Sequence, residues 1–376
     1  MKKNHNGSIF LFLFHCVVYV LFFLFSFTQT DPNLTILNHP VWMEFQQFFW
    51  QIGYHQRPLA TALYVVLVAL LFVDYGLLLN HASEKIKRVA LFFSIFILLI
   101  SYPLFSHDIF NYMFNARMVV QYGVNPHTHT ALEFSNDLWT RFMHNTHTSA
   151  PYGYAWTAFS LIPYVLGIGK FLLTLLTFKL FSLAGLLLLL WTQRKENYWW
   201  SFALHPLVLV ETIAVGHNDA WMMFLWFFGV VLIQKNVRMK IVGVISILFS
   251  LFIKYATILI IPVELFRTRS KFFQQYYAEI SAGMLSLLLL HPRTQWFYPW
   301  YLIWALSFLP SIHVRWVRAL LFSAGLASMF RYAPYFFTGN YTDSSVFVQQ
   351  SISIGGTFTI FMIWTSLSWL HGRMRK

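Results

Sequence analysis

The stretch FLLTLLTFKLFSLAGLLLLLW, residues 171–191, decides the fold class of this chain. Lys179 is the one charged side chain within it. An α-helix of about 20 residues spans the hydrocarbon core of a bilayer, because each residue adds about 1.5 Å along the axis. We therefore predict a membrane-spanning helix at this position.

Apolar runs of similar character occur along the whole chain. Several are shorter than a perpendicular span needs, so their helices are expected to extend into the polar flanks. Residues 155–168 form a further run, which we interpret as a short or re-entrant helix. The predicted fold is an all-α integral membrane protein, a polytopic bundle of about 12 transmembrane helices. The other runs cover residues 8–27, 59–79, 89–105, 199–215, 221–233, 241–253, 256–266, 278–290, 301–309, 319–329 and 352–370.

The composition favours a membrane protein over a water-soluble one. Of the 376 residues, 58% are hydrophobic and only 10% are charged, whereas soluble domains are about one quarter charged. The formal net charge of +13 would favour nucleic-acid binding in a soluble domain. The single cysteine, Cys16, lies in an apolar run and excludes a disulfide framework or a Cys-based metal site within one chain.

Lysine and arginine residues gather in alternate loops. If each run except 155–168 crosses the membrane once, the basic loops all fall on the side of the N-terminus. This positive-inside pattern predicts that both termini are cytoplasmic, and it explains the net charge without nucleic acid. The opposite face and the spans contain only Arg57, Arg117, Arg141, Lys170, Lys179, Lys254, Arg293 and Arg331.

Two long connections, residues 28–58 and 106–154, are predicted on the non-cytoplasmic side. The aromatic spacing of residues 41–50 within the first favours a helix lying in the membrane interface. The second connection is too long for a passive linker. No internal repeat or soluble module is evident, so residues 1–376 are interpreted as one domain, with residues 8–27 as a retained first helix rather than a signal peptide.

Asp108 lies where the third predicted helix meets the outer surface, in the sequence Ser106-His107-Asp108. Partial desolvation there would raise the pKa of its carboxyl group and make it a useful base. The alternative is a helix cap or a solvated loop acid. Arg117 follows on the same segment, and Tyr152 lies in a Pro-Tyr-Gly turn before the short helix at 155–168.

A second polar cluster follows the fifth span. His205 and Glu211 precede the sequence Gly216-His217-Asn218-Asp219 at the outer end of that span. A histidine and an aspartate two residues apart can orient substrate hydroxyl groups. A polar turn that only joins two helices is the simpler interpretation, and metal ligation is less favoured than either.

Lys254 is a cation at the outer end of the seventh predicted helix. A charge in a membrane setting needs a negative partner and is a functional candidate, although a lysine near a helix end can also reach the interface. Arg293 and Arg331 are further outer cations. An aromatic belt explains most of the string that contains Trp300. The loop histidines, 127, 129, 144 and 147, are interpreted as exposed rather than metal-binding.

Taken in order, these pieces resemble the polytopic GT-C glycosyltransferases, especially the prokaryotic polyprenol-phosphate-mannose-dependent mannosyltransferases. Two departures affect the sugar and the acceptor: Asn115-Ala116 stands where the family often has Asp-Gly, and His205 replaces an asparagine that commonly precedes the proline. The resemblance is carried by residues 108–112, Arg117, 123–126, 151–153, Trp156, 205–211, 216–219, 254–256 and 299–302.

The resemblance implies an inverting transfer of a sugar, expected to be mannose, from a polyprenyl-phosphate donor to a glycan or lipid acceptor at the non-cytoplasmic face. Asp108 matches the acid that acts as the base, and cations near the interface would stabilise the leaving phosphate. No cofactor is implied, and a divalent metal is not required because the donor carries a single phosphate. The expected phosphate-binding residues are Lys254, Arg293 and Arg331, and the expected substrate-binding residues are Arg117, Tyr152, His217, Asp219 and Trp300.

Two alternatives remain. A transporter or lipid flippase would also place ionisable groups in helices, but such proteins tend to have internal repeats and helices broken in mid-membrane. A non-catalytic membrane scaffold would give no reason for Asp108, Lys254 and the His217/Asp219 pair to share one face.

Overall fold

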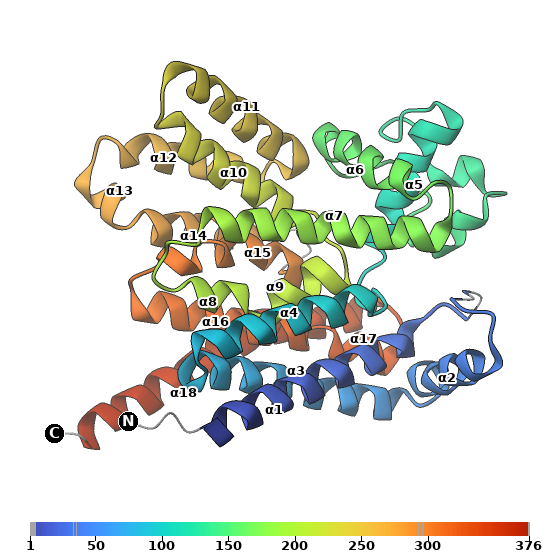
Figure 1. Cartoon of the computed structure of the whole chain (residues 1–376), viewed down its shortest axis with the longest axis horizontal. Helices are drawn as coiled ribbons and strands as arrows, with labels where there is room; N and C mark the ends of the chain where they lie inside the picture. Colours follow the sequence, from blue (N-terminus) through green and yellow to red (C-terminus); the bar gives the residue numbers. More distant parts are fainter. Residues whose placement is uncertain (1–4, 33, 35, 292–293, 295–296, 375–376) are drawn as a thin grey trace.

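The computed structural model describes residues 5–32, 34, 36–291, 294 and 297–374. Its regular elements within these residues are all helical (Figure 1). The helices run roughly parallel to the long axis of the molecule, and short or irregular pieces occupy its two ends. The prediction of an all-α membrane protein is confirmed.

Four helices among the described residues are long and apolar enough to cross a membrane. They are α1 (His5–Ser26), α3 (Arg57–His81), α7 (Phe171–Thr192) and α18 (Asp343–Met374). A fifth crossing results if the bent pair Pro206–Ala214 and Asp219–Ile233 is one span. Length and composition therefore support four or five spans, and they do not establish the predicted count of about 12.

Shorter helices lie alongside the long ones. They include α4 (Glu84–Ile100), α10 (Asp219–Ile233), α11 (Val237–Lys254), α14 (Tyr277–Leu288) and α16 (Arg315–Phe330). Helix α10 packs extensively on α11, and α16 packs on α18. Each of these short helices coincides with an apolar run of the sequence.

Three of the predicted runs are not continuous helices. Residues 199–215 form α8 (Trp199–Ala203), α9 (Pro206–Leu209) and the π-helix η5 (Val210–Ala214). Residues 256–266 form η6 (Ala256–Ile260) and most of α12 (Ile261–Arg267). Residues 301–309 contain α15 (Leu302–Leu306), which lies between η8 (Pro299–Tyr301) and η9 (Leu309–Ser311). A proline stands in the first turn of α9, α12, η8 and η9. Proline has no N–H for the preceding turn and fits a helix start, so it divides an apolar run.

The two long predicted connections are largely folded. Residues 28–58 contain the predicted interfacial helix, α2 (Pro40–Trp50), and residues 106–154 contain α5 (Asp108–Tyr122), η3 (Ala131–Phe134) and η4 (Leu138–Phe142). With α6 (Tyr154–Leu166), these pieces form one end of the molecule, and the start of α1 and the end of α18 lie toward the other end (Figure 1).

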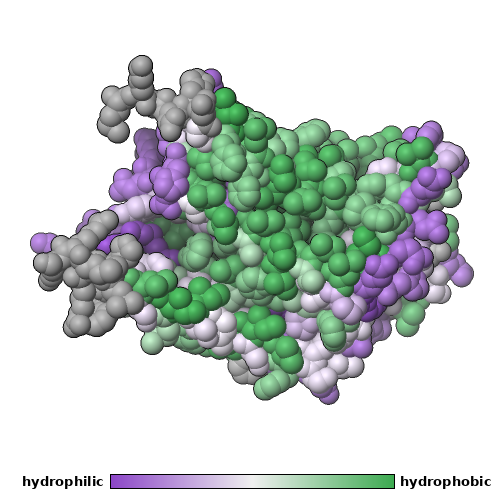
Figure 2. All heavy atoms as spheres, turned by 90° about the horizontal axis from the view of Figure 1, so that it is seen from below, coloured by the Kyte–Doolittle hydropathy of each residue, from purple (hydrophilic) through white to green (hydrophobic). Residues whose placement is uncertain are grey.

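The surface agrees with a membrane environment. Figure 2 shows a broad apolar zone across the middle of one face, with hydrophilic residues gathered toward both ends. Large apolar side chains point outward, among them Phe92, which is 73% exposed, and Phe10, which is 66% exposed. Such exposure is unfavourable in water and suits contact with lipid chains.

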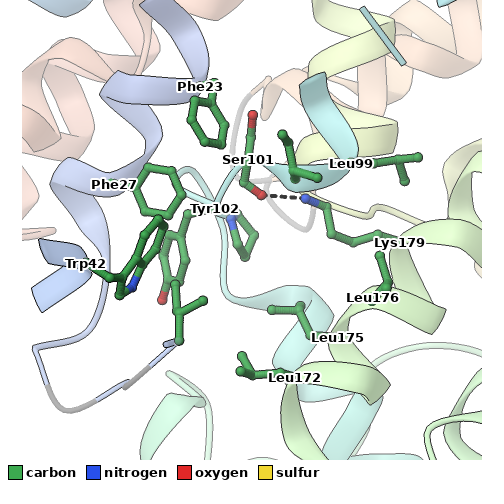
Figure 3. A pocket seen from close by; sticks show the side chains of 13 residues that line it. Phe23, Phe27, Trp42, Leu99, Ser101, Tyr102, Leu172, Leu175, Leu176 and Lys179 are labelled. Atoms are coloured by element: carbon green, nitrogen blue, oxygen red, sulfur yellow. Dashed lines mark hydrogen bonds between the residues drawn. The ribbon is translucent and has the colours of Figure 1, made fainter. Parts of the chain in front are cut away.

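Buried ionisable side chains join α1 to α3 and α7 to α4. His15 of α1 lies 2.7 Å from Asp74 of α3. Lys179 of α7 donates to the carbonyl oxygens of Leu98 (2.9 Å) and Ser101 at the end of α4, where helix carbonyl groups lack internal partners. Lys179 also lines an apolar pocket of about 350 Å³ (Figure 3). The His15–Asp74 pair and Lys179 are therefore each explained by contacts between helices.

Candidate functional site

Asp108 is the first residue of α5, a position where a negative charge is favoured by the helix dipole. Its side chain is 19% exposed. The amide nitrogen of Asn111 donates to it over 3.5 Å, and Tyr152 also hydrogen-bonds to it. Burial raises the pKa of the Asp108 carboxyl group, and the positive charge of Lys254 opposes that rise. The structure thus presents a half-buried acid whose pKa lies above its ordinary value.

A break between two helices is packed against Asp108. The η5 and α10 halves meet at 111°, and Gly216 in the break has a φ of +88°. A Cβ atom on Gly216 would lie 2.5 Å from Cδ1 of Ile109. Only glycine combines this backbone conformation with such a close approach, so Gly216 allows the 216–219 turn to contact the start of α5.

His217 projects from this break and is fully buried. Its Nδ1 atom lies 3.6 Å from an oxygen of Asp108, and its Nε2 atom lies 3.4 Å from an oxygen of Glu211. These distances place the three groups in one row without tight hydrogen bonds. The ring of Trp300 stacks on the imidazole at a centroid distance of 4.5 Å.

Asp219 and Lys254 form a buried ion pair beside this row. The Nζ atom of Lys254 donates to both oxygens of Asp219, at 2.9 and 2.8 Å. The indole N–H of Trp304 donates to the same carboxylate over 2.5 Å. The ring of Tyr301 lies 5.0 Å from the Lys254 ammonium. A buried charge needs such partners, and here they fix the position of the lysine.

Tyr152 reaches the site because its turn rests on the end of α11. The N–H of Gly153 donates to the carbonyl oxygen of Ile253 over 3.0 Å. A Cβ atom on Gly153 would lie 1.9 Å from the carbonyl oxygen of Phe252, so a larger residue would push this turn away. The Pro-Tyr-Gly sequence therefore places Tyr152 next to Asp108, on the backbone that leads into Lys254.

The C-terminal end of α16 closes the opposite side. The hydroxyl group of Tyr332 donates to Glu211 over 2.8 Å. Arg331 is buried, with its guanidinium 4.4 Å from the centre of the Tyr298 ring. Tyr298 in turn stacks on Trp300 at 4.2 Å. A second cation is thereby connected to His217 through a stack of aromatic rings.

Several buried polar atoms around Asp108 have no hydrogen-bond partner among the described residues. They belong to Asn111, Tyr112, Glu211, His217 and Asn218. Buried polar groups in folded proteins are nearly always hydrogen-bonded, and each exception needs an explanation. A concentration of exceptions around a half-buried acid is the property expected of a ligand-binding site.

Most of the predicted site residues meet here, in the cluster that we call the Asp108 site. Arg117 does not, because it lies about 13 Å farther along α5, at about 1.5 Å per residue, and pairs with Asp137 at 2.5 Å. Arg293 lies outside the described residues. The site consists of Asp108, Tyr152, Glu211, His217, Asn218, Asp219, Lys254, Trp300, Arg331 and Tyr332.

Glu211, Asn218 and Tyr332 were not among the predicted site residues. An acid inside an apolar run is a functional signal in its own right, and it would have identified Glu211. Asn218 could have been included as part of the 216–219 sequence. Nothing in the sequence around Tyr332 distinguishes it from the other aromatic residues of the chain.

Three of the four loop histidines, 127, 129 and 144, make ordinary contacts. His127 hydrogen-bonds Thr157 at 2.9 Å, His129 contacts Glu133 at 2.7 Å, and His144 stacks on His107. Within the described part of the chain, no group of three or more His, Cys, Asp or Glu residues is arranged to hold a metal ion.

Comparison with known proteins provides the family. The family model described as alpha-(1->6)-mannopyranosyltransferase, N-terminal domain, matches residues 33–267. Alpha-(1->6)-mannopyranosyltransferase A of Mycobacterium tuberculosis (strain ATCC 25618 / H37Rv) is 26% identical over 252 residues, covering 63% of this chain. The match covers 46% of that relative, so the chain spans about half the length of the relative it matches. No solved structure matches the chain.

Proposed function

The chain belongs to the alpha-(1->6)-mannopyranosyltransferase family, and from that membership we propose that it transfers a mannosyl group from a polyprenyl-phosphate donor to an acceptor hydroxyl. The observation that carries this proposal is the half-buried carboxyl group of Asp108, held among unpaired polar groups and near a fixed cation. A base, a site for hydroxyl groups and a cation for phosphate are the parts that such a transfer requires.

In the proposed reaction, Asp108 takes the proton of the acceptor hydroxyl as the oxygen attacks the anomeric carbon of the donor. The bond from that carbon to the phosphate oxygen breaks, and polyprenyl phosphate leaves. Because the displacement is direct, the configuration of the anomeric carbon inverts. The raised pKa of Asp108 suits this role, since a stronger base takes a hydroxyl proton more readily.

Negative charge develops on the leaving phosphate, and we assign its stabilisation to Lys254 and Arg331. Lys254 is held by Asp219, so its position costs no reordering during the reaction. Arg293 keeps the same proposed role from the family resemblance alone. The single phosphate of the donor does not demand a divalent metal, and none is included in the proposal.

The remaining polar residues are proposed to hold the sugars. Tyr152 and His217 contact the Asp108 region directly. Trp300 is stacked between His217 and Tyr298, so it is proposed to support substrate binding by holding the imidazole in place. Both oxygens of Asp219 accept from Lys254, so Asp219 is proposed to support substrate binding by orienting that lysine.

We further propose that the Asp108 site faces the non-cytoplasmic side and that both termini are cytoplasmic. The support is the positive-inside pattern together with the arrangement in Figure 1, where α5 and the 123–153 segment lie at the end opposite the start of α1. With the short helices included, about 12 crossings remain the proposed count.

Transport or lipid flipping is the second candidate, and one observation favours it. Transporters bind substrates at helices broken within the membrane, and the bend between Pro206–Ala214 and Asp219–Ile233 would be such a break if this pair forms one span. If the pair forms two spans, the bend is the polar turn predicted at 216–219, and the argument against transport stands. The family membership keeps glycosyl transfer first.

The deciding experiment incubates the purified chain with polyprenyl-phosphate mannose and a panel of mannosides, comparing wild type with Asp108→Asn. Wild type should transfer mannose, and the variant should lose about 10²–10⁴-fold of the rate. No transfer by wild type to any acceptor would contradict the proposal, and full activity of the variant would remove Asp108 as the base. Reconstituted vesicles with labelled lipid in one leaflet test flipping separately.

A further inference from the structure

A polar hollow lies away from the Asp108 site. It is formed by the C-terminal half of α5 with the η3–η4 segment and has a volume of about 510 Å³. That volume falls within the range of small-molecule sites, about 300–1,000 Å³. We call it the α5 hollow. Its polar lining includes Arg117, Tyr122, Glu133, Asn136 and Asp137, and Phe134 and Trp139 add aromatic rings.

One wall of the α5 hollow is organised around Asp137. Its Oδ2 atom accepts from Arg117 (2.5 Å) and from the hydroxyl group of Tyr122 (2.7 Å). Its Oδ1 atom accepts from the backbone N–H of Trp139 over 3.0 Å. Arg117 also donates to the hydroxyl group of Tyr164 over 3.3 Å. These bonds cross between α5, the loop and α6, so the wall is formed before any ligand binds.

Aromatic rings alternate with these polar groups. The guanidinium of Arg117 lies 4.6 Å from the ring centre of Trp139, and the rings of Tyr122 and Phe134 pack at 4.4 Å. A sugar ring has apolar C–H faces and a rim of hydroxyl groups. Aromatic faces beside fixed carboxylate, amide and guanidinium groups match both surfaces.

The charge of the hollow favours a neutral ligand. Arg117 is neutralised by Asp137, and the other acid, Glu133, contacts His129 at 2.7 Å. No net positive charge is therefore offered to a phosphate. Asp137 already accepts three hydrogen bonds, so it is poorly suited to bind a metal ion.

From these contacts we propose that the α5 hollow binds the neutral sugar chain of a glycan acceptor, distant from the transferring end. The proposal rests on the proposed function, which supplies a hydroxyl-bearing acceptor at Asp108. Helix α5 connects the two places, because Asp108 begins it and Tyr122 ends it, about 21 Å apart at about 1.5 Å per residue. The hollow would make the enzyme prefer long acceptors over short ones.

The test measures binding and transfer with a mannose disaccharide and a mannose hexasaccharide, using the full chain in detergent. Trp139→Ala should weaken hexasaccharide binding at least about tenfold, as loss of a central aromatic contact does. Disaccharide binding and its turnover should stay unchanged. Asn136→Ala removes an exposed amide that the fold does not need and should weaken the hexasaccharide less, in the same direction. Trp316→Ala, an exposed tryptophan at the start of α16, is the matched control.

Failure of this inference is distinct from failure of the proposed function. If Asp108→Asn binds the hexasaccharide like wild type but transfers nothing, both proposals stand. If wild type transfers mannose, and if Trp139→Ala and Asn136→Ala bind and use the disaccharide and the hexasaccharide as well as wild type does, the hollow is not an acceptor site. Displacement of the hexasaccharide by inorganic phosphate would also overturn the inference, since the hollow would then bind anions.

Discussion

Glu211, His217 and Asp108 form a row of acid, imidazole and acid in which the two outer carboxylates have different surroundings. Glu211 is fully buried and accepts from Tyr332, whereas Asp108 is partly exposed at the start of a helix. Only Asp108 is placed to meet a substrate entering from solvent. We infer that Glu211 is a positioning residue, since its second carboxyl oxygen lies 3.4 Å from Nε2 of His217.

The first prediction concerns this positioning role. Glu211→Gln keeps the shape and the Tyr332 hydrogen bond but replaces the carboxyl oxygen that faces His217 with an amide nitrogen. We expect kcat to fall on the order of tenfold, the effect of one altered buried polar contact, with little change in KM for the donor. Steady-state kinetics with both substrates measure the split. Tyr332→Phe removes the hydrogen bond to Glu211 but leaves the Glu211 carboxyl group in place. An equal loss of kcat in this variant would assign the effect to the packing around Glu211 instead.

The second prediction concerns pH. A base works only when deprotonated, so kcat/KM should fall as the pH drops through the raised pKa of Asp108. The charge of Lys254 holds that pKa down, and Lys254→Met should therefore move the acid limb of the profile to higher pH. The midpoint does not depend on how much enzyme is active. Lys235→Met, an exposed lysine outside the site, should leave the midpoint in place.

At this scale the sequence predicts residue types better than partners. Asp108, His217, Asp219 and Lys254 were all predicted site residues, because ionisable groups in an apolar chain are few. Their pairing was not predictable: Asp219 could equally have faced a sugar, and Arg117 could have pointed toward Asp108. Which partner a side chain meets depends on the packing of α5, α10 and α11, and no local pattern encodes it.

Among the helices and turns, prolines and glycines determine where the site forms. Pro206 starts a new helical segment within an apolar run and Pro299 starts one just before the run at 301–309, whereas Pro163 lies inside α6 without ending it. Apolarity predicted where helical segments occur, and it could not predict which prolines interrupt them. The interruption at 215–218 is the one that brings His217 to Asp108.

The third prediction tests that interruption. Gly216→Ala adds a methyl group 2.5 Å from Ile109 at a φ of +88°, so the turn must shift or strain. A strained backbone position costs about 1–3 kcal/mol. We expect a lower melting temperature in detergent and a large loss of transfer. Gly283→Ala in α14 meets nothing within 4 Å and should be neutral or slightly stabilising; equal effects of both variants would contradict the assigned role of Gly216.

Considered as a whole, the molecule has two different ends joined by an apolar middle. The folded 106–154 segment and α2 occupy one end, and the beginning of α1 lies toward the other (Figure 1). Composition alone predicted the apolar middle, since 10% charged residues cannot cover a soluble surface. The number of crossings is harder to predict, because short helices within a bundle need not meet the length of an isolated span.

The last prediction assigns the two ends to the two sides of the membrane. In a Cys16→Ser background, single cysteines are placed at two exposed positions, Asn145→Cys in the 106–154 segment and Lys195→Cys after α7. A membrane-impermeant thiol reagent should label position 145 in intact cells and position 195 only after permeabilisation. The basic loop at 194–195 is expected to stay inside, because lysine and arginine resist translocation. If position 195 alone is labelled in intact cells, the proposed topology is wrong and the Asp108 site lies on the cytoplasmic face. A donor presented from outside cannot reach the site there.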